Sequence, residues 1–387
     1  MSVTAARGFV ASGVAAGVKV SGDLDVALVA TDDGSPVPAA GVFTSNLMTA
    51  APVVVSRAHL ESTGGHAVAV ILNAGNANAA TGDTGRAHAE AMCEAVADAL
   101  GCAPDEVLVC STGLIGIPLP VQLITAAAPG LVAARSSDGA SDAAEAICTT
   151  DTVRKEVVVA ADGFIVGGMA KGAAMLQPNM ATMLAVLTTD AAAGPEVLAE
   201  VLANGVGESF NRLSVDGCTS TNDTVLLLAS GRAGEVDQRE LALAVARACS
   251  SLAEQMAADA EGATKVVRVN VLGASSDSDA DLAARAVANS VLCKCSWYGA
   301  DPYWGRVASE LGSSGIRFEP SRLRISYGGV MVADGGVAIA HDQQSVAAHM
   351  ATDRIDLVCD LGLGPGRALV LTNDLTHAYV DENMGTS

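Results

Sequence analysis

Short apolar runs recur along the chain and predict a protein that contains many β-strands. Each run has the length of a strand and is bounded by small or polar residues; the runs are 25–30, 67–72, 106–110, 156–161, 185–190, 224–230, 265–273, 322–327 and 367–372. Apolar runs of about four to nine residues between turn signals are typical of buried strands.

Amphipathic segments lie between these runs and predict helices. One covers 84–100 and stops at Gly101, and others begin after Pro195 or cover 237–258, 279–292 and 302–311. Because strands and helices do not alternate strictly, the pattern disfavours a doubly wound Rossmann sheet. It predicts an α/β (α+β) fold, a layered sandwich of mixed sheets covered by helices. The only candidate linker is the segment 129–142, PGLVAARSSDGASD.

Composition and charge narrow the classes of partner. The chain has 387 residues, of which 50% are hydrophobic, so it can form large buried cores. A net charge of −21 and an aromatic content of 3% argue against binding to nucleic acid or to an anionic membrane. No apolar run approaches the roughly 20 residues of a membrane helix. The apolar stretch after Arg7 fits a strand or loop better than a signal peptide.

Cysteines and histidines suggest neither a metal site nor a catalytic triad. The nine cysteines are scattered and are predicted to be reduced thiols of a cytoplasmic protein. The six histidines stand in no triad or ligand spacing, and motifs for nucleotides, serine hydrolysis or zinc are missing. We therefore expect no metal and no cofactor. If the protein is an enzyme, its base is not expected to be a histidine.

Seven strings rich in small and amide residues are the most informative feature of the chain. They are LNAGNANAATGD (72–83), CSTGLIG (110–116), TTDTVRKEV (149–157), KGAAMLQPNMATML (171–184), VDGCTSTNDT (215–224), DAEGATK (259–265) and DPYWGR (301–306). Each alone is consistent with a turn or a helix cap, because Asn, Asp, Gly, Ser and Thr favour such positions for local reasons. Glycine-containing turns also bring backbone N–H groups close to a ligand, as an oxyanion hole requires.

As a set, these strings resemble the ornithine acetyltransferase family, the glutamate N-acetyltransferases of the cyclic arginine pathway. The resemblance extends from about Asn73 to the C-terminus. It implies an N-terminal-nucleophile-like fold and a precursor that cleaves itself between Ala181 and Thr182. The products would be an α chain of residues 1–181 and a β chain of residues 182–387. Members of the family usually assemble as heterotetramers of two α and two β chains.

Cleavage would change the chemistry of Thr182. As an N-terminal residue it gains an α-amine with an ordinary pKa of about 7.7 to 8.0, which suits a general base near neutral pH. Threonine activated by its own amine is a known alternative to a histidine-based triad. The resemblance implies a ping-pong reaction in which Thr182 takes the acetyl group of N2-acetyl-L-ornithine and passes it to L-glutamate. Whether acetyl-CoA is a second donor stays open.

The resemblance also assigns roles to other residues. Thr112 and Gly113 map onto the oxyanion hole. The substrate-binding positions are Thr149, Lys171, Thr182, Glu261, Asn383 and Ser387. Lys171 would suit a carboxylate and Glu261 an ammonium group.

Simpler interpretations of the same residues are also open. Lys171 would then be a solvated surface lysine, Glu261 a helix-end carboxylate, and Thr182 the packed start of a strand. An N-terminal-threonine hydrolase, either an N-acyl amino acid amidohydrolase or an aminopeptidase, is the alternative enzyme. A binding protein without activity is the non-enzymatic alternative. Family departures at Arg154, Tyr303 and the shortened C-terminus ENMGTS concern specificity rather than the reaction class.

Overall fold

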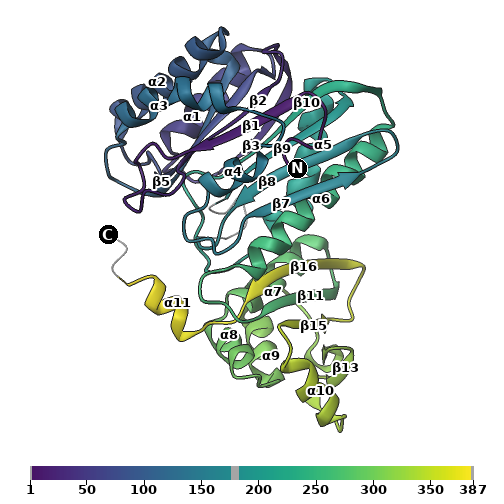
Figure 1. The fold of residues 1–387 in the computed structure, drawn as a ribbon. Coiled ribbons are helices and arrows are strands. Elements are labelled where there is room, and N and C mark those ends of the chain that lie inside the picture. Colours follow the sequence, from purple (N-terminus) through teal and green to yellow (C-terminus); the bar gives the residue numbers. More distant parts are fainter. Residues whose placement is uncertain (1, 176–182, 385–387) are drawn as a thin grey trace. The chain divides into compact units, whose positions relative to one another are not determined.

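The computed structural model describes residues 2–175 and 183–384, and the chain divides into two compact units (Figure 1). The first unit contains Met1–Asn211 and Cys218–Met256, and the second contains Arg212–Gly217 and Ala257–Ser387. The boundary between these units is not the predicted cleavage site. In the described part of the chain, no helix combines the length and the apolar character that crossing a membrane requires.

The first unit contains a four-stranded mixed sheet with the order β1-β2-β5-β6. Its strands are β1 (Phe9–Val14), β2 (Val26–Thr31), β5 (Ala69–Asn76) and β6 (Val107–Leu114). The β5–β6 pair is parallel, whereas the other pairs are antiparallel. One face is covered by α1 (Ala51–Ser62), α2 (Gly82–Leu100) and α3 (Val121–Ala134).

A six-stranded sheet with the order β4-β3-β10-β9-β8-β7 forms the next layer of this unit. The strands are β3 (Val37–Phe43), β4 (His66–Ala67), β7 (Lys155–Ala160), β8 (Ile165–Lys171), β9 (Leu184–Ala192) and β10 (Thr224–Glu235). β9 pairs in parallel with β10 and antiparallel with β8. Helices α5 (Pro195–Glu208) and α6 (Gln238–Ala258) cover the outer face of this sheet.

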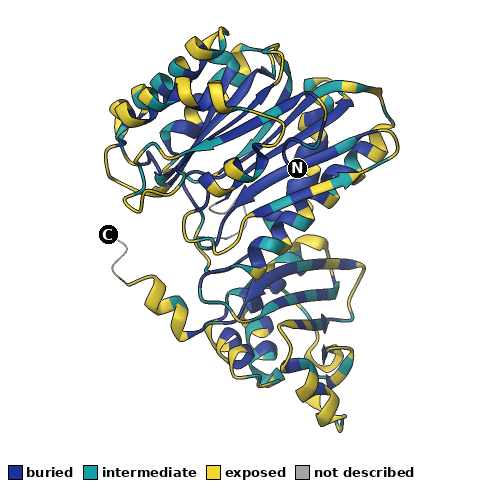
Figure 2. Cartoon of the chain, in the orientation of Figure 1, coloured by how far each residue is buried: buried dark blue, intermediate teal, exposed yellow. Residues whose placement is uncertain are grey.

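Alternation along β2 shows how the layers are held together. Val26, Leu28 and Ala30 pack under the helices, whereas Ala27 and Val29 point to the second sheet. Successive side chains of a strand point to opposite faces, so a strand buried on both sides reads as a continuous apolar run. Helix α4 (Ala140–Ala146) adds four buried alanines to the core between the sheets. The strands of this unit are accordingly buried for most of their length (Figure 2).

The second unit has its own mixed sheet with the order β14-β13-β12-β15-β11-β16. The strands are β11 (Val266–Ala274), β12 (Arg324–Tyr327), β13 (Val330–Asp334), β14 (Val337–Ala338), β15 (Arg354–Asp360) and β16 (Gly366–Asn373). Its helices are α7 (Asp277–Asn289), α8 (Val291–Tyr298), α9 (Trp304–Ser313), α10 (Gln343–Met350) and α11 (His377–Glu382). Trp297 and Tyr327 are the largest fully buried side chains of its core.

The architecture confirms the prediction of mixed sheets covered by helices rather than a doubly wound sheet. Every predicted strand and helix has a counterpart, with ends that differ by a few residues. The linker prediction for 129–142 is wrong. These residues lie inside the first unit, where they complete α3, form the short turn 135–139 and begin α4, whose Ala140 packs into the core.

Candidate active site

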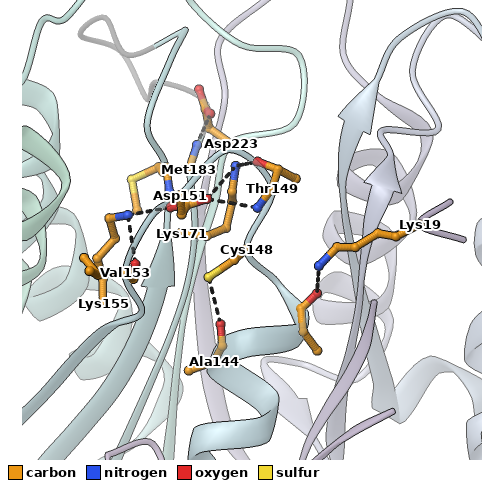
Figure 3. A network of polar contacts seen from close by, with 12 residues as sticks. Lys19, Ala144, Cys148, Thr149, Asp151, Val153, Lys155, Lys171, Met183 and Asp223 are labelled. Carbon is orange, nitrogen blue, oxygen red and sulfur yellow. Dashed lines mark hydrogen bonds and ion pairs between the residues drawn. The ribbon is translucent and has the colours of Figure 1, made fainter. Parts of the chain in front are cut away.

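Two predicted substrate-binding residues, Lys171 and Thr149, meet in the first unit (Figure 3). Lys171 is the last residue of β8, and its side chain is almost completely buried. Its Nζ atom donates a hydrogen bond of 2.6 Å to Oγ1 of Thr149, which lies in the loop between α4 and β7 and is exposed. Lys171 is therefore not the solvated surface lysine of the simpler interpretation. Its ammonium group lies just beneath a polar residue that water can reach.

Asp151 connects this pair to a second buried lysine. Its Oδ1 accepts 2.6 Å and 2.7 Å hydrogen bonds from Nζ of Lys155 and N–H of Gly172. Its Oδ2 accepts a 3.0 Å hydrogen bond from N–H of Thr149 and lies 3.6 Å from Nζ of Lys171. Burial opposes ionisation of Asp151, but the two lysines and these hydrogen bonds hold the pKa of its carboxyl well below the usual range.

Two buried lysines share one carboxylate in this cluster. The side chains of Lys155 and Asp151 are fully buried and pair at 2.6 Å. Lys171 shares the same carboxylate at the longer distance of 3.6 Å. A buried cation whose charge is only partly compensated is costly, so Lys171 is suited to bind an anion such as a carboxylate.

Ala181 and Thr182, the predicted cleavage residues, lie outside the described residues. The chain resumes at Met183, whose N–H donates a 2.9 Å hydrogen bond to Oδ1 of Asp223 and whose carbonyl accepts one of 3.1 Å from N–H of Thr224. Asp223 is fully buried and directly precedes β10. Burial raises the pKa of its carboxyl well above the usual range, and the Met183 N–H, the Ser220 hydroxyl and the charge of Lys171 do not outweigh burial.

The predicted oxyanion residues Thr112 and Gly113 lie at the end of β6 in the same unit. Nδ2 of Asn222 donates hydrogen bonds to the carbonyls of Ser111 (2.9 Å) and Ala77 (2.6 Å). The dipeptide Asn222–Asp223 thus joins the residue before Thr112 to the residue after Thr182. Thr112 is buried and Gly113 is exposed.

Only glycine fits at position 113. Its φ is +129°, and a Cβ atom there would lie 2.3 Å from the carbonyl carbon of Gly75 on β5. Glycine therefore permits the close approach of β5 and β6 at this point.

Glu261 and Asn383 are brought together in the second unit. Nδ2 of Asn383 donates a 2.8 Å hydrogen bond to Oε2 of Glu261 and a 2.9 Å one to the carbonyl of Tyr379. Gly262 allows this contact, because a Cβ atom there would lie 2.2 Å from the nitrogen of Tyr379 on α11. Ser387 lies outside the described residues.

Three ionisable residues of the site have no role in the predictions from sequence: Asp151, Lys155 and Asp223. Asp151 and Asp223 stand inside the quoted strings TTDT and TSTNDT, so the strings marked their position but not their charge state. Lys155 begins β7 in a sequence that is typical of an exposed strand end. Nothing in the local sequence indicates its complete burial.

The family model and the curated relatives agree on one family. The model of the ArgJ family matches residues 10–385, and the chain therefore belongs to this family. It is 48% identical over 389 residues to the arginine biosynthesis bifunctional protein ArgJ of Streptomyces avermitilis, and 46% identical over 391 residues to that of Streptomyces coelicolor. In both comparisons the match covers 100% of this chain and 100% of the relative.

A solved structure is similar to part of the chain. It is ornithine acetyltransferase of Mycobacterium tuberculosis in complex with ornithine, with 45% identity and a TM-score of 0.44, and the match covers 47% of this chain and 95% of that one. The match to the ArgJ family and its full-length relatives confirms the resemblance to the ornithine acetyltransferase family of arginine biosynthesis. Membership of this family assigns the chain to the acetyltransferase enzymes.

Proposed function

We propose that this protein transfers the acetyl group of N2-acetyl-L-ornithine to L-glutamate, with ornithine and N-acetyl-L-glutamate as products. The observation that carries the proposal is the buried Lys171, which shares the carboxylate of Asp151 with Lys155 and lies beside the exposed Thr149. Both substrates are amino-acid derivatives with a carboxylate that such a cation can bind. Membership of the ArgJ family supports the choice of substrates.

Thr182 is the proposed nucleophile of a two-step reaction. Its α-amine removes the hydroxyl proton while Oγ attacks the acetyl carbonyl, and the proton then passes to the departing amine of ornithine. The acetyl-Thr182 ester is next attacked by the amine of glutamate, which restores the hydroxyl. One amide is exchanged for a similar one, so no energy source is needed. Thr112 and Gly113 are the proposed donors to the oxyanion, and each such donor is worth about 3 to 4 kcal/mol in transition-state stabilisation.

Cleavage between Ala181 and Thr182 is part of the proposal, because only a chain end supplies the α-amine. The proposed products are the α chain 1–181 and the β chain 182–387, assembled as a heterotetramer in the cytoplasm. The position of Met183 supports this step. The N–H of Met183 donates a hydrogen bond to Asp223, and its carbonyl accepts one from Thr224, the first residue of β10. Both hydrogen bonds would hold the new chain end in place.

Intact mass and a residue exchange test the cleavage. The mass spectrum of the purified wild-type protein should show two chains, with the masses expected for cleavage between Ala181 and Thr182. Thr182→Ala should show one uncleaved, inactive chain, because it removes the attacking hydroxyl. Thr182→Ser is the matched control and should still be cleaved, because it keeps that hydroxyl. Cleavage of the alanine variant at the same bond would contradict the proposed nucleophile.

A second assay separates transfer from hydrolysis. We expect catalytic ornithine release from N2-acetyl-L-ornithine to require L-glutamate and to form N-acetyl-L-glutamate in equal amount. Sustained release of acetate without glutamate would instead indicate an N-terminal-threonine hydrolase. Replacing acetylornithine with acetyl-CoA in the same assay determines whether a second donor is used.

A further inference from the structure

Asp223 is a buried carboxyl group that the proposed reaction steps do not use. It has no exposed surface, and Oδ1 accepts the N–H of Met183 at 2.9 Å. Its own carbonyl accepts an N–H from Thr44 at 2.9 Å, so its backbone is also bound to the segment after β3. The second carboxyl oxygen, Oδ2, has no hydrogen-bond partner among the residues that the structure describes.

We propose that Asp223 is a positioning residue that holds Met183 through an uncharged carboxyl group, and that the lack of charge leaves Lys171 free to bind the substrate. This inference rests on the proposed function, because it concerns the residue that directly follows the proposed nucleophile.

The surroundings of Asp223 favour the uncharged form. Lys171 is the one described ionisable group whose charge acts on this carboxyl. Met183 contributes a backbone N–H, Ser220 a neutral hydroxyl, and Thr44 contacts only the carbonyl of Asp223. On β6, burial raises the pKa of the Cys110 thiol to about 12, so this neighbour of Thr224 is neutral as well. A carboxylate with one oxygen buried and unpaired would carry a large desolvation cost, which is why the pKa of Asp223 is raised.

A charged Asp223 would interfere with the proposed reaction in two ways. It would add a second negative charge beside Lys171, and the cluster of Lys155, Asp151 and Lys171 would no longer attract a substrate carboxylate. It would also stabilise the ammonium form of an amine at residue 182, which is covalently joined to Met183, and so would weaken the proposed base. An uncharged carboxyl still accepts the Met183 N–H and causes neither effect.

Asp223→Asn tests the charge state by stability, without any assay of activity. In the folded wild-type protein Asp223 keeps its proton, whereas the unfolded chain releases this proton above a pKa of about 3.9. The free energy of unfolding therefore falls as the pH rises above about 4. Asparagine keeps a carbonyl acceptor and cannot ionise. The Asn variant should therefore melt at a higher temperature than wild type at pH 7.5, and the difference should shrink toward pH 4.

Asp190→Asn is the matched control for this measurement. Asp190 is also buried, on β9, but it forms an ion pair of 2.7 Å with Arg7 and accepts the N–H of Ile165. Replacing Asp190 with asparagine removes this ion pair, so the substitution should not raise the melting temperature at pH 7.5. A lower melting temperature of Asp223→Asn at pH 7.5 would overturn the proposal, because it would mean that Asp223 is ionised.

Acetyl transfer tests the positioning role. Asp223→Asn should keep kcat within about threefold of wild type, whereas Asp223→Ala, which has no acceptor for the Met183 N–H, should lose about tenfold or more in kcat. KM for both substrates should change little in the alanine variant. Equal losses in Asn and Ala variants would overturn the proposal in favour of an ionised or proton-transferring Asp223. If wild type itself shows no transfer, the proposed function fails, and the melting curves still determine the charge of Asp223.

Discussion

Asp151 sets the charge balance of the candidate site at the scale of single residues. Its carboxylate pairs with both Lys155, at 2.6 Å, and Lys171, at 3.6 Å, and both lysines are buried. The strength of such a cluster depends on water being excluded, because the effective dielectric falls inside a protein. The lysine that is held less closely by Asp151 is the one predicted to bind substrate.

Asp151→Asn should destabilise the protein by about 3 to 5 kcal/mol, because it removes the carboxylate that pairs with the buried Lys155 at 2.6 Å. Thermal unfolding of the variant measures the effect. The low pKa of Asp151 means that its contribution is present above the unfolded pKa of about 3.9 and is lost as the pH falls below it. The difference from wild type should therefore be large at pH 7 and should decrease in acid.

Asp32→Asn is the control for this prediction, because Asp32 pairs with Arg232 on the surface. Water screens that pair, and its loss should change the melting temperature little. If both variants melt like wild type, Lys155 does not depend on Asp151 as described.

Gly113→Ala should abolish most activity while the fold persists. The added Cβ atom would collide with the backbone of Gly75 and Asn76, and relief of the collision would move the proposed oxyanion donors. The expected loss is about 10²- to 10³-fold in kcat, as for removal of one oxyanion donor, and steady-state assays measure it.

Gly116→Ala separates this collision from backbone strain. Gly116 also has a positive φ, of +81°, but nothing lies within 4 Å of the point that a Cβ atom would occupy there. It should lose far less activity than Gly113→Ala. Equal losses would show that strain of the loop, and not the contact with β5, is responsible.

Elements were easier to predict from sequence than the site. β2 reads as an almost continuous apolar run because both of its faces are buried, and α2 ends at Gly101, which has a φ of +77°. β8 was missed because Gly167 and Gly168 weaken its strand pattern. These glycines are needed for close packing, since a Cβ atom at Gly167 would lie 2.0 Å from the carbonyl oxygen of Ser2. Such a requirement arises from a segment that is distant in the sequence.

The same reason explains which site residues could be predicted. Thr149 and Lys171 were named through family motifs, and their side chains do meet. Asp151 and Lys155 acquire their roles only when α4, β7 and β8 fold together and exclude water from the cluster. Charge state is a property of burial, and burial is not visible in a string such as TTDTVRK.

At the scale of the whole molecule, the proposed cleavage products share one sheet. In the order β4-β3-β10-β9-β8-β7, the two central strands belong to residues 182–387 and the four outer ones to residues 1–181. β9 is bonded to β8 along its length, and β10 to β3. The core between the two sheets likewise contains side chains from both proposed cleavage products, such as Leu72 from residues 1–181 and Leu226 from residues 182–387.

The cleaved chains should therefore stay together under native conditions. Separation would expose the backbone N–H and C=O groups of β8 and β9 together with their buried apolar side chains, which is strongly unfavourable. Size-exclusion chromatography should give one peak that contains both chains, and concentrated guanidinium chloride should resolve them. The uncleaved Thr182→Ala protein is the control and should elute at the same native volume. Release of a folded 182–387 chain in native buffer would contradict the prediction, because β9 and β10 would then be stable without the strands that flank them.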